Sequence, residues 1–167
     1  MALNQAEFQR FVADHGPALY RMAFRMVGDR HEAEDLVQEA YRSAWKSRRT
    51  YQPDRSERAW LASILRRRAI DRWRRKPAPA VLSGDAPVEI SVDGDDPTGQ
   101  TYTDEMQHAL NQLPHDLRET LLLVVVTELT HQEAADLLGV PLGTVLSRVS
   151  RARSRIRELL LAATRTT

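Results

Sequence analysis

The stretch LTHQEAADLLGVPLGTVLSRVSRARSRIREL, residues 129–159, decides how the C-terminal part of the chain folds. Thr130 followed three residues later by Glu133 predicts a capping box that starts a helix. Gly139 supplies the left-handed conformation that ends this helix, and Pro141 suits the first turn of the next one. Two helices joined by so short a turn indicate a helix-turn-helix motif.

The second helix of this motif separates apolar from basic residues. At about 100° per residue, five apolar residues share one face that we expect to be buried: Val145, Val149, Ala152, Ile156 and Leu159. Arginines flank that face: Arg148, Arg151 and Arg155 on one side, Arg153 and Arg157 on the other. Serines lie opposite it: Ser147, Ser150 and Ser154. Small hydroxyls between guanidinium groups suit a helix in the DNA major groove. A solvated basic face is the alternative.

Charge is distributed unevenly along the 167 residues, although the net charge is only +1. Residues 1–76 contain 17 Lys and Arg against 10 Asp and Glu, a net of +7. Residues 77–105 contain seven acidic residues and no basic one, and residues 106–167 contain seven Arg against six acids. This pattern predicts three segments: a basic domain at 1–76, a linker at 77–105 and a second domain at 106–167.

The acidic segment reads PAPAVLSGDAPVEISVDGDDPTGQTYTDE and holds four of the eight prolines and three of the seven glycines. Such a composition, without hydrophobic periodicity, predicts a flexible, extended linker. Both flanking segments have apolar residues at helical spacing. In the N-terminal one we expect two short helices separated at Gly16-Pro17, then helices over HEAEDLVQEAYRSAWKS and ERAWLASILRRRAIDRWRRK. The fold class is therefore all-α: two small helical domains joined by the acidic linker.

The composition argues against several other classes of protein. Without cysteine the chain has no disulfide or thiolate metal site. The N-terminus does not resemble a signal peptide, and the longest aliphatic run, 121–126, is far shorter than the roughly 20 residues that span a bilayer. HEAED at 31–35 lacks the second histidine of a zinc-protease motif. We expect a cytoplasmic protein without membrane insertion, catalytic residues, metal or cofactor.

The helix ERAWLASILRRRAIDRWRRK and the loop before it suit single-stranded nucleic acid. Arginines offer cations for a phosphate backbone, and aromatic rings can stack on unpaired bases. Both Trp60 and Trp73 are also suited to a place in the core. The preceding helix has a different exterior, which is a candidate protein-docking face or a solvated one: Glu34, Asp35, Gln38, Glu39 and Arg42.

These motifs, in this order, resemble bacterial RNA polymerase sigma factors of the extracytoplasmic-function (ECF) class. AEDLVQEAYRSAW (33–45) resembles the polymerase-docking helix of region 2, and AWLASILRRRAIDRWRR (59–75) the helix that melts and reads the minus-ten promoter element. LPHDLRETLLL (113–123), with the helix-turn-helix, resembles region 4, which reads the minus-thirty-five element and docks on the β flap. The implied function is promoter-specific initiation of transcription with core RNA polymerase.

The resemblance implies roles for individual residues. The residues expected to face the β′ clamp are Asp35, Leu36, Gln38 and Glu39. Those expected at the minus-ten element, where loop 46–56 would capture a flipped base, are Arg48, Arg49, Tyr51, Trp60, Arg66, Arg67, Arg68 and Arg72. Those expected at the minus-thirty-five element are Thr144, Ser147, Arg148, Ser150, Arg151 and Arg153. An anti-sigma factor is a further expected partner.

The chain departs from the family pattern at two positions. The family often has Asn where this chain has Arg67, and Lys or Arg where it has Leu146. Leu146 removes one expected phosphate contact. A stand-alone helix-turn-helix regulator is the alternative, and it accounts for residues 129–159 but not for the basic helix with its tryptophans or for the acidic linker.

Overall fold

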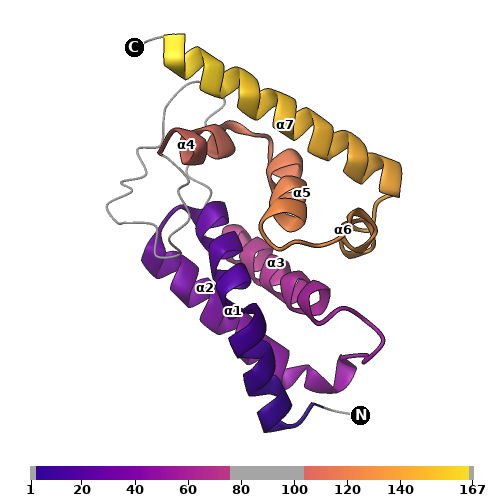
Figure 1. The fold of residues 1–167 in the computed structure, drawn as a ribbon. Coiled ribbons are helices and arrows are strands. Elements are labelled where there is room, and N and C mark those ends of the chain that lie inside the picture. Colours follow the sequence, from indigo (N-terminus) through magenta and orange to yellow (C-terminus); the bar gives the residue numbers. More distant parts are fainter. Residues whose placement is uncertain (1–2, 76–103, 166–167) are drawn as a thin grey trace.

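The computed structural model describes residues 3–75 and 104–165, and every regular element in these two ranges is a helix (Figure 1). The elements are α1 (Gln5–Val27), α2 (Arg30–Lys46), the short 3₁₀ helix η1 (Arg48–Thr50), α3 (Glu57–Arg75), α4 (Asp104–Gln112), α5 (His115–Val125), α6 (His131–Leu138) and α7 (Leu142–Arg165). The predicted all-α class is confirmed. The linker predicted at 77–105 lies outside the described residues except for its last two, which begin α4.

Helices α1, α2 and α3 form the N-terminal bundle, residues 5–75, in which α2 and α3 both pack against α1. Each helix buries the apolar face that its spacing predicts, and the largest fully buried side chains there are Phe11, Leu19, Met22, Leu36, Leu61 and Leu65. Gly28 ends α1 at φ 71°, donating its N–H to the Phe24 carbonyl. Asp29 then caps α2 by accepting from the Glu32 N–H at 2.9 Å.

The predicted break at Gly16-Pro17 is wrong, because α1 is one helix of 23 residues with Pro17 inside it. Proline removes one backbone hydrogen bond from a helix, but the apolar face continues across it from Phe11 to Met22, and both side chains are buried. Packing of that face against α2 and α3 keeps the helix continuous. Gly16 has its own packing role, since a Cβ there would lie 2.9 Å from the Tyr41 hydroxyl. Burial raises the pKa of Tyr41 to about 12.

Helices α4–α7 form the C-terminal domain, residues 104–165, in which α7 extends along the other three (Figure 1). It packs against α4, α5 and α6. The stripe predicted on α7 is buried at Val145, Val149, Ala152 and Ile156, and Leu159 is half-buried against the core. One face of α7 is therefore buried in its own domain, and the opposite face, with Ser147, Ser150 and Ser154, is exposed; we call it the open face of α7.

The two domains pack against each other, α5 on α1 and α6 on α3. The Arg25 guanidinium donates to the Gln107 side-chain oxygen at 2.9 Å, and both residues are buried. The Thr127 hydroxyl lies 3.3 Å from the Met22 sulfur, and neither residue is exposed. Apolar residues of both domains consequently belong to one continuous core.

Candidate nucleic-acid and polymerase interfaces

The helix-turn-helix forms from the local signals in its sequence. The Thr130 hydroxyl accepts from the Glu133 N–H at 3.0 Å, which is the Thr130 half of the predicted capping box. Gly139 has φ 67° and ends α6 by donating its N–H to the Ala135 carbonyl. Pro141 accepts from Thr144 at 3.0 Å and thereby starts α7. The outward face of α7 is therefore set by a turn whose geometry only a few residues allow.

The six residues predicted for the upstream element all lie on or beside the open face of α7. Ser147, Ser150, Arg151 and Arg153 are exposed, and Thr144 and Arg148 are partly exposed. Arg151 donates to the Ser147 hydroxyl at 2.9 Å, so this guanidinium is held across the serine. Arg148 lies 3.9 Å from the Asp116 carboxylate of α5. The face presents hydroxyls and cations together, which suits phosphate and base-edge contacts.

The docking face predicted on α2 is partly exposed and partly buried. The Asp35 side chain is 72% exposed, Glu39 is 40% exposed, and Gln38 is exposed. Leu36 lies in the core with none of its surface exposed. Leu36 is thus placed to hold α2 against the bundle, while the other three present polar groups outward.

The arginines of α3 divide into engaged and exposed ones. Arg72 donates to the Glu32 carbonyl at 2.8 Å and lies 3.6 Å from the Glu39 carboxylate. Arg68 forms an ion pair with Asp71 at 3.1 Å. Arg67, one of the two departures from the family pattern, is exposed.

Arg66 connects the two domains. Its guanidinium forms an ion pair with Glu119 of α5, whose side chain is only 3% exposed. His115, one turn before Glu119, lies 3.5 Å from the same carboxylate and packs edge-on against the Trp73 ring at 4.9 Å. A helix predicted to bind DNA thus contacts the other domain through one of its candidate arginines.

The loop between α2 and α3 keeps its aromatic residue inside. Tyr51 is only 7% exposed, with its ring 5.3 Å from Phe11 and 5.1 Å from the half-buried Trp60. Burial, and next the Glu57 carboxylate, raise the pKa of the Tyr51 phenol. Both rings pack against the bundle in this structure. The cations nearby are more accessible: Arg49 is exposed and Arg48 is partly exposed.

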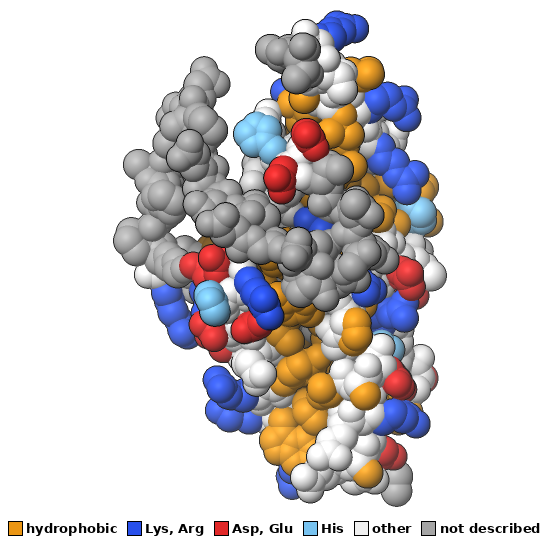
Figure 2. All heavy atoms as spheres, turned by 60° about the vertical axis from the view of Figure 1, so that its left-hand side comes forward, with side chains coloured by type: hydrophobic (Ala, Val, Ile, Leu, Met, Phe, Trp, Pro, Cys, Tyr) orange, Lys and Arg blue, Asp and Glu red, His pale blue; other side chains and the backbone are white. Residues whose placement is uncertain are grey.

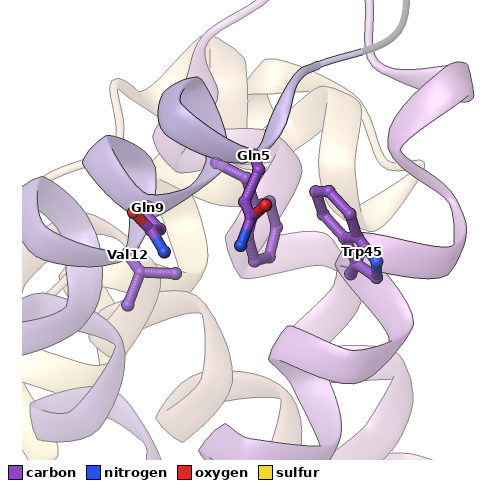
Figure 3. A pocket seen from close by; sticks show the side chains of 5 residues that line it. Gln5, Gln9, Val12 and Trp45 are labelled. Atoms are coloured by element: carbon purple, nitrogen blue, oxygen red, sulfur yellow. The ribbon is translucent and has the colours of Figure 1, made fainter.

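A shallow hollow of about 450 Å³ lies beside this loop, between α1 and the end of α2. Figure 3 shows Gln5, Gln9 and Val12 of α1 on one side and the Trp45 indole of α2 on the other. The Arg48 guanidinium lies 4.1 Å from the centre of the Trp45 ring, a cation–π contact. Trp45 therefore fixes the position of one candidate DNA-binding arginine.

A second, more apolar groove of about 590 Å³ lies on the C-terminal domain between α4, α5 and α7. We call it the C-terminal groove; its lining includes Leu110, Leu121, Val125, Ile156 and Leu161, with Arg153 and Arg157 beside them. Val125 and Leu161 are 43% and 53% exposed. Figure 2 shows separate clusters of hydrophobic side chains on the face that is turned forward, with basic side chains beside several of them. Sequence reasoning missed this groove, although the apolar residues of 121–126 exceed what one buried helix face needs.

The fold and these surfaces define a two-domain transcription factor that combines a helix-turn-helix with a basic helical bundle. The family models agree with this definition: Sigma-70 region 2 matches residues 11–77, and Sigma-70 region 4 matches residues 103–156. The chain belongs to the ECF sigma factors of RNA polymerase.

Relatives and solved structures carry the same description. The chain is 36% identical to the ECF RNA polymerase sigma factor EcfG of Rhodopseudomonas palustris, over 86% of this chain and 80% of that protein. It is 34% identical to SigE of Mycolicibacterium smegmatis over 92% of this chain, which spans 61% of that longer protein. The sigma factor RpoE, solved with the anti-sigma factor NepR from Bartonella quintana, superposes with a TM-score of 0.75 at 29% identity, over 92% of this chain and 96% of that one.

The sequence-based prediction of the family is therefore confirmed. Promoter-specific initiation of transcription with RNA polymerase is the function of that family, and its members are not enzymes. In the described ranges, no helix is long and apolar enough to cross a membrane.

Proposed function

We propose that this chain directs core RNA polymerase to promoters by using its two domains on two DNA elements, and that it has no catalytic activity of its own. The N-terminal domain (1–76) would melt and bind the minus-ten element, and the C-terminal domain (106–167) would bind the minus-thirty-five element, with the 77–105 segment as linker. The observation that carries this proposal is the open face of α7, where Ser147 and Arg151 form a hydrogen-bonded pair of 2.9 Å on a helix-turn-helix.

The minus-ten assignment rests on the basic loop and α3. Arg49 and Arg67 are exposed, so these two cations are available to a DNA strand without rearrangement. Arg48 is held by the Trp45 ring and donates to the Trp45 carbonyl at 2.8 Å. Arg66 and Arg72 are engaged by carboxylates instead. Tyr51 and Trp60 would have to turn out of the bundle to stack on a flipped base. The assignment therefore implies that the loop rearranges when the duplex opens.

Two protein partners fit two different surfaces. The carboxylates of Asp35 and Glu39 suit a basic surface of the β′ clamp. The C-terminal groove, apolar and bordered by Arg153 and Arg157, suits an amphipathic helix such as the β flap would supply. An anti-sigma factor is a further proposed partner, because RpoE was solved in complex with the anti-sigma factor NepR. With RNA polymerase as its partner, we expect the chain to act in the cytoplasm.

Internal ion pairs favour weak DNA binding by the free chain. Arg66, Arg72 and Arg148 each lie within 4 Å of a carboxylate, and those carboxylates must be displaced before phosphates can take their place. We expect the free chain to bind duplex DNA poorly and without sequence preference. Tight, sequence-specific binding by the isolated full-length chain would contradict this.

Transcription in vitro with core polymerase and a pool of promoter sequences tests the proposed function. The expected result is chain-dependent initiation from a subset of promoters that share two elements. A pull-down with core polymerase distinguishes the alternative: no binding to polymerase, together with tight binding of the chain alone to duplex DNA, would indicate a stand-alone regulator.

A further inference from the structure

Exposed large apolar side chains fall on only two surfaces of the described residues. They are Val125, Leu142, Leu146 and Leu161. Val125 and Leu161 line the C-terminal groove. Leu142 and Leu146 do not line that groove: they lie on the first two turns of α7, where they are 40% and 49% exposed.

Leu142 and Leu146 form one patch, because residues four apart are neighbours on a helix face. Leu146 directly precedes Ser147 and lies one turn before Ser150, so the patch borders the open face of α7. In a helix-turn-helix the N-terminal residues of the second helix contact base edges. The patch therefore lies at the part of α7 that would enter the major groove most deeply.

Gly143 lies between the two leucines, and no contact within the described residues requires a glycine at this position. Among the described residues, no atom lies within 4 Å of where its Cβ would be. Its backbone is helical, whereas Gly28 and Gly139 are the glycines with positive φ among the described residues. A glycine inside a helix costs about 0.5–1 kcal/mol relative to alanine. A close approach of the helix backbone to a ligand explains both the glycine and the open space beside it.

The charges around the patch select the kind of ligand. Arg153 lies two turns after Leu146 on the same side of α7, and Arg151 lies across the serine face from it. No carboxylate is present in α7 before Glu158. An anionic polymer complements this basic surface better than an apolar protein surface does. Duplex DNA offers an apolar group in the major groove, the C5-methyl of thymine, which apolar side chains contact.

We propose that Leu146, supported by Leu142, contacts the C5-methyl group of a thymine in the upstream promoter element. This inference rests on the proposed function, in which α7 binds that element. Leu146 is then a specificity-determining residue, and it exchanges the phosphate contact of its relatives for recognition of a base.

Deoxyuridine provides a direct test, because it lacks only this methyl group. A promoter duplex is selected from a random pool by the holoenzyme, and each thymine of its upstream element is replaced in turn by deoxyuridine. Burial of one methyl group is expected to change affinity about fourfold. The wild-type holoenzyme should lose that factor at one thymine or at two adjacent thymines. The Leu146→Ala holoenzyme should bind the thymine and uracil duplexes equally well.

Two further variants make the outcome specific. Leu161→Ala removes an equally exposed leucine of the same helix, and it should keep the full uracil effect whatever it does to polymerase binding. Leu146→Lys should abolish the uracil effect and steepen the salt dependence of binding by about one phosphate contact.

Other outcomes would overturn the inference. These are a selected upstream element without thymine, uracil substitutions without effect on the wild type, or a uracil effect that persists in Leu146→Ala. Weaker assembly of the Leu146→Ala holoenzyme in the absence of DNA would instead indicate a protein contact. If the chain neither binds core polymerase nor supports transcription, the proposed function itself is refuted. The promoter selection with holoenzyme shows this before any uracil is introduced.

Discussion

Helices α3 and α7 are both rich in arginine, yet their guanidinium groups have different surroundings. In α3, Arg66 forms an ion pair with the buried Glu119 of the other domain, and Arg72 donates to the Glu32 carbonyl. In α7, Arg151 bonds only within its own helix, to Ser147, and Arg153 is exposed. Arg66 of α3 thus holds the two domains together, whereas Arg151 and Arg153 of α7 remain open to solvent.

This difference separates arginines that stabilise the fold from arginines that are available to a ligand. A carboxylate that is 3% exposed has lost most of its hydration and depends on its cation. An exposed arginine stays hydrated without a carboxylate partner, so its substitution changes the free energy of unfolding little. We infer that Arg151 and Arg153 of α7 can contact DNA without breaking an ion pair, whereas Arg66 of α3 has to exchange Glu119 for DNA.

The substitution Arg66→Ala should produce the largest effect. It leaves Glu119 buried without its cation, which costs about 3 kcal/mol, the lower end of the range for a broken buried pair, because His115 remains 3.5 Å away. Urea unfolding followed by tryptophan fluorescence measures this loss. Arg67→Ala, the exposed neighbour on the same helix, is the matched control and should stay within about 0.5 kcal/mol of the wild type.

If domain contacts rather than the folds of the domains are lost in Arg66→Ala, small-angle X-ray scattering will show a larger radius of gyration with helical content unchanged. Equal unfolding midpoints and equal radii for Arg66→Ala and Arg67→Ala would show that the ion pair contributes nothing, and the contrast between α3 and α7 would fail.

Arg151→Ala should give the opposite pattern: unchanged stability but altered promoter choice. Losing one base-edge contact reduces discrimination by about 1–3 kcal/mol, roughly tenfold. Competition between the selected promoter and single-base variants, with the mutant holoenzyme, measures it. Arg165→Ala, at the far end of α7, should leave promoter choice unchanged. A uniform loss of affinity across all variants would instead mean that Arg151 contacts only phosphate.

Much of this contrast could be predicted from sequence where a local signal exists. The buried stripe of α7 follows from helical periodicity, and its start and open face follow from Gly139 and Pro141. The split of α1 at Pro17 was predicted wrongly, because a local signal was outweighed by packing from Phe11 to Met22 along the whole face.

Contacts between distant residues had no sequence signal. Arg66 and Glu119 are 53 residues apart in the sequence. Nothing in either segment indicates that Glu119 is buried or that it forms an ion pair with Arg66. The C-terminal groove needs α4, α5 and α7 together, so no single amphipathic pattern predicts it. Tyr51 was interpreted as a base-stacking candidate from its basic neighbours, whereas its burial depends on Phe11 in another helix.

Glu39→Ala tests whether the carboxylates around Arg72 serve a partner as well as the fold. Since Asp35 also lies 3.8 Å from Arg72, the ion pair is not lost entirely and stability should change little. Affinity for core polymerase should fall about fivefold, the value of roughly 1 kcal/mol for one partly exposed charge pair. Fluorescence anisotropy of labelled chain titrated with core polymerase measures it, with Glu158→Ala of α7 as the control. Equal affinity for wild type and Glu39→Ala would remove Glu39 from the docking face.

The smallest expected effect compares a glycine of each domain. Gly143→Ala should raise stability by about 0.5–1 kcal/mol, because alanine is the better helix former and the added methyl meets no atom of residues 3–75 and 104–165 within 4 Å. Gly16→Ala should gain less, because its methyl would lie 2.9 Å from the Tyr41 hydroxyl, which is packed in the bundle. Thermal unfolding ranks the two variants. If Gly143→Ala also weakens promoter binding while it stabilises the free chain, the open space beside α7 is used by DNA; a stabilised variant with unchanged promoter affinity would mean that the helix backbone and the duplex stay apart.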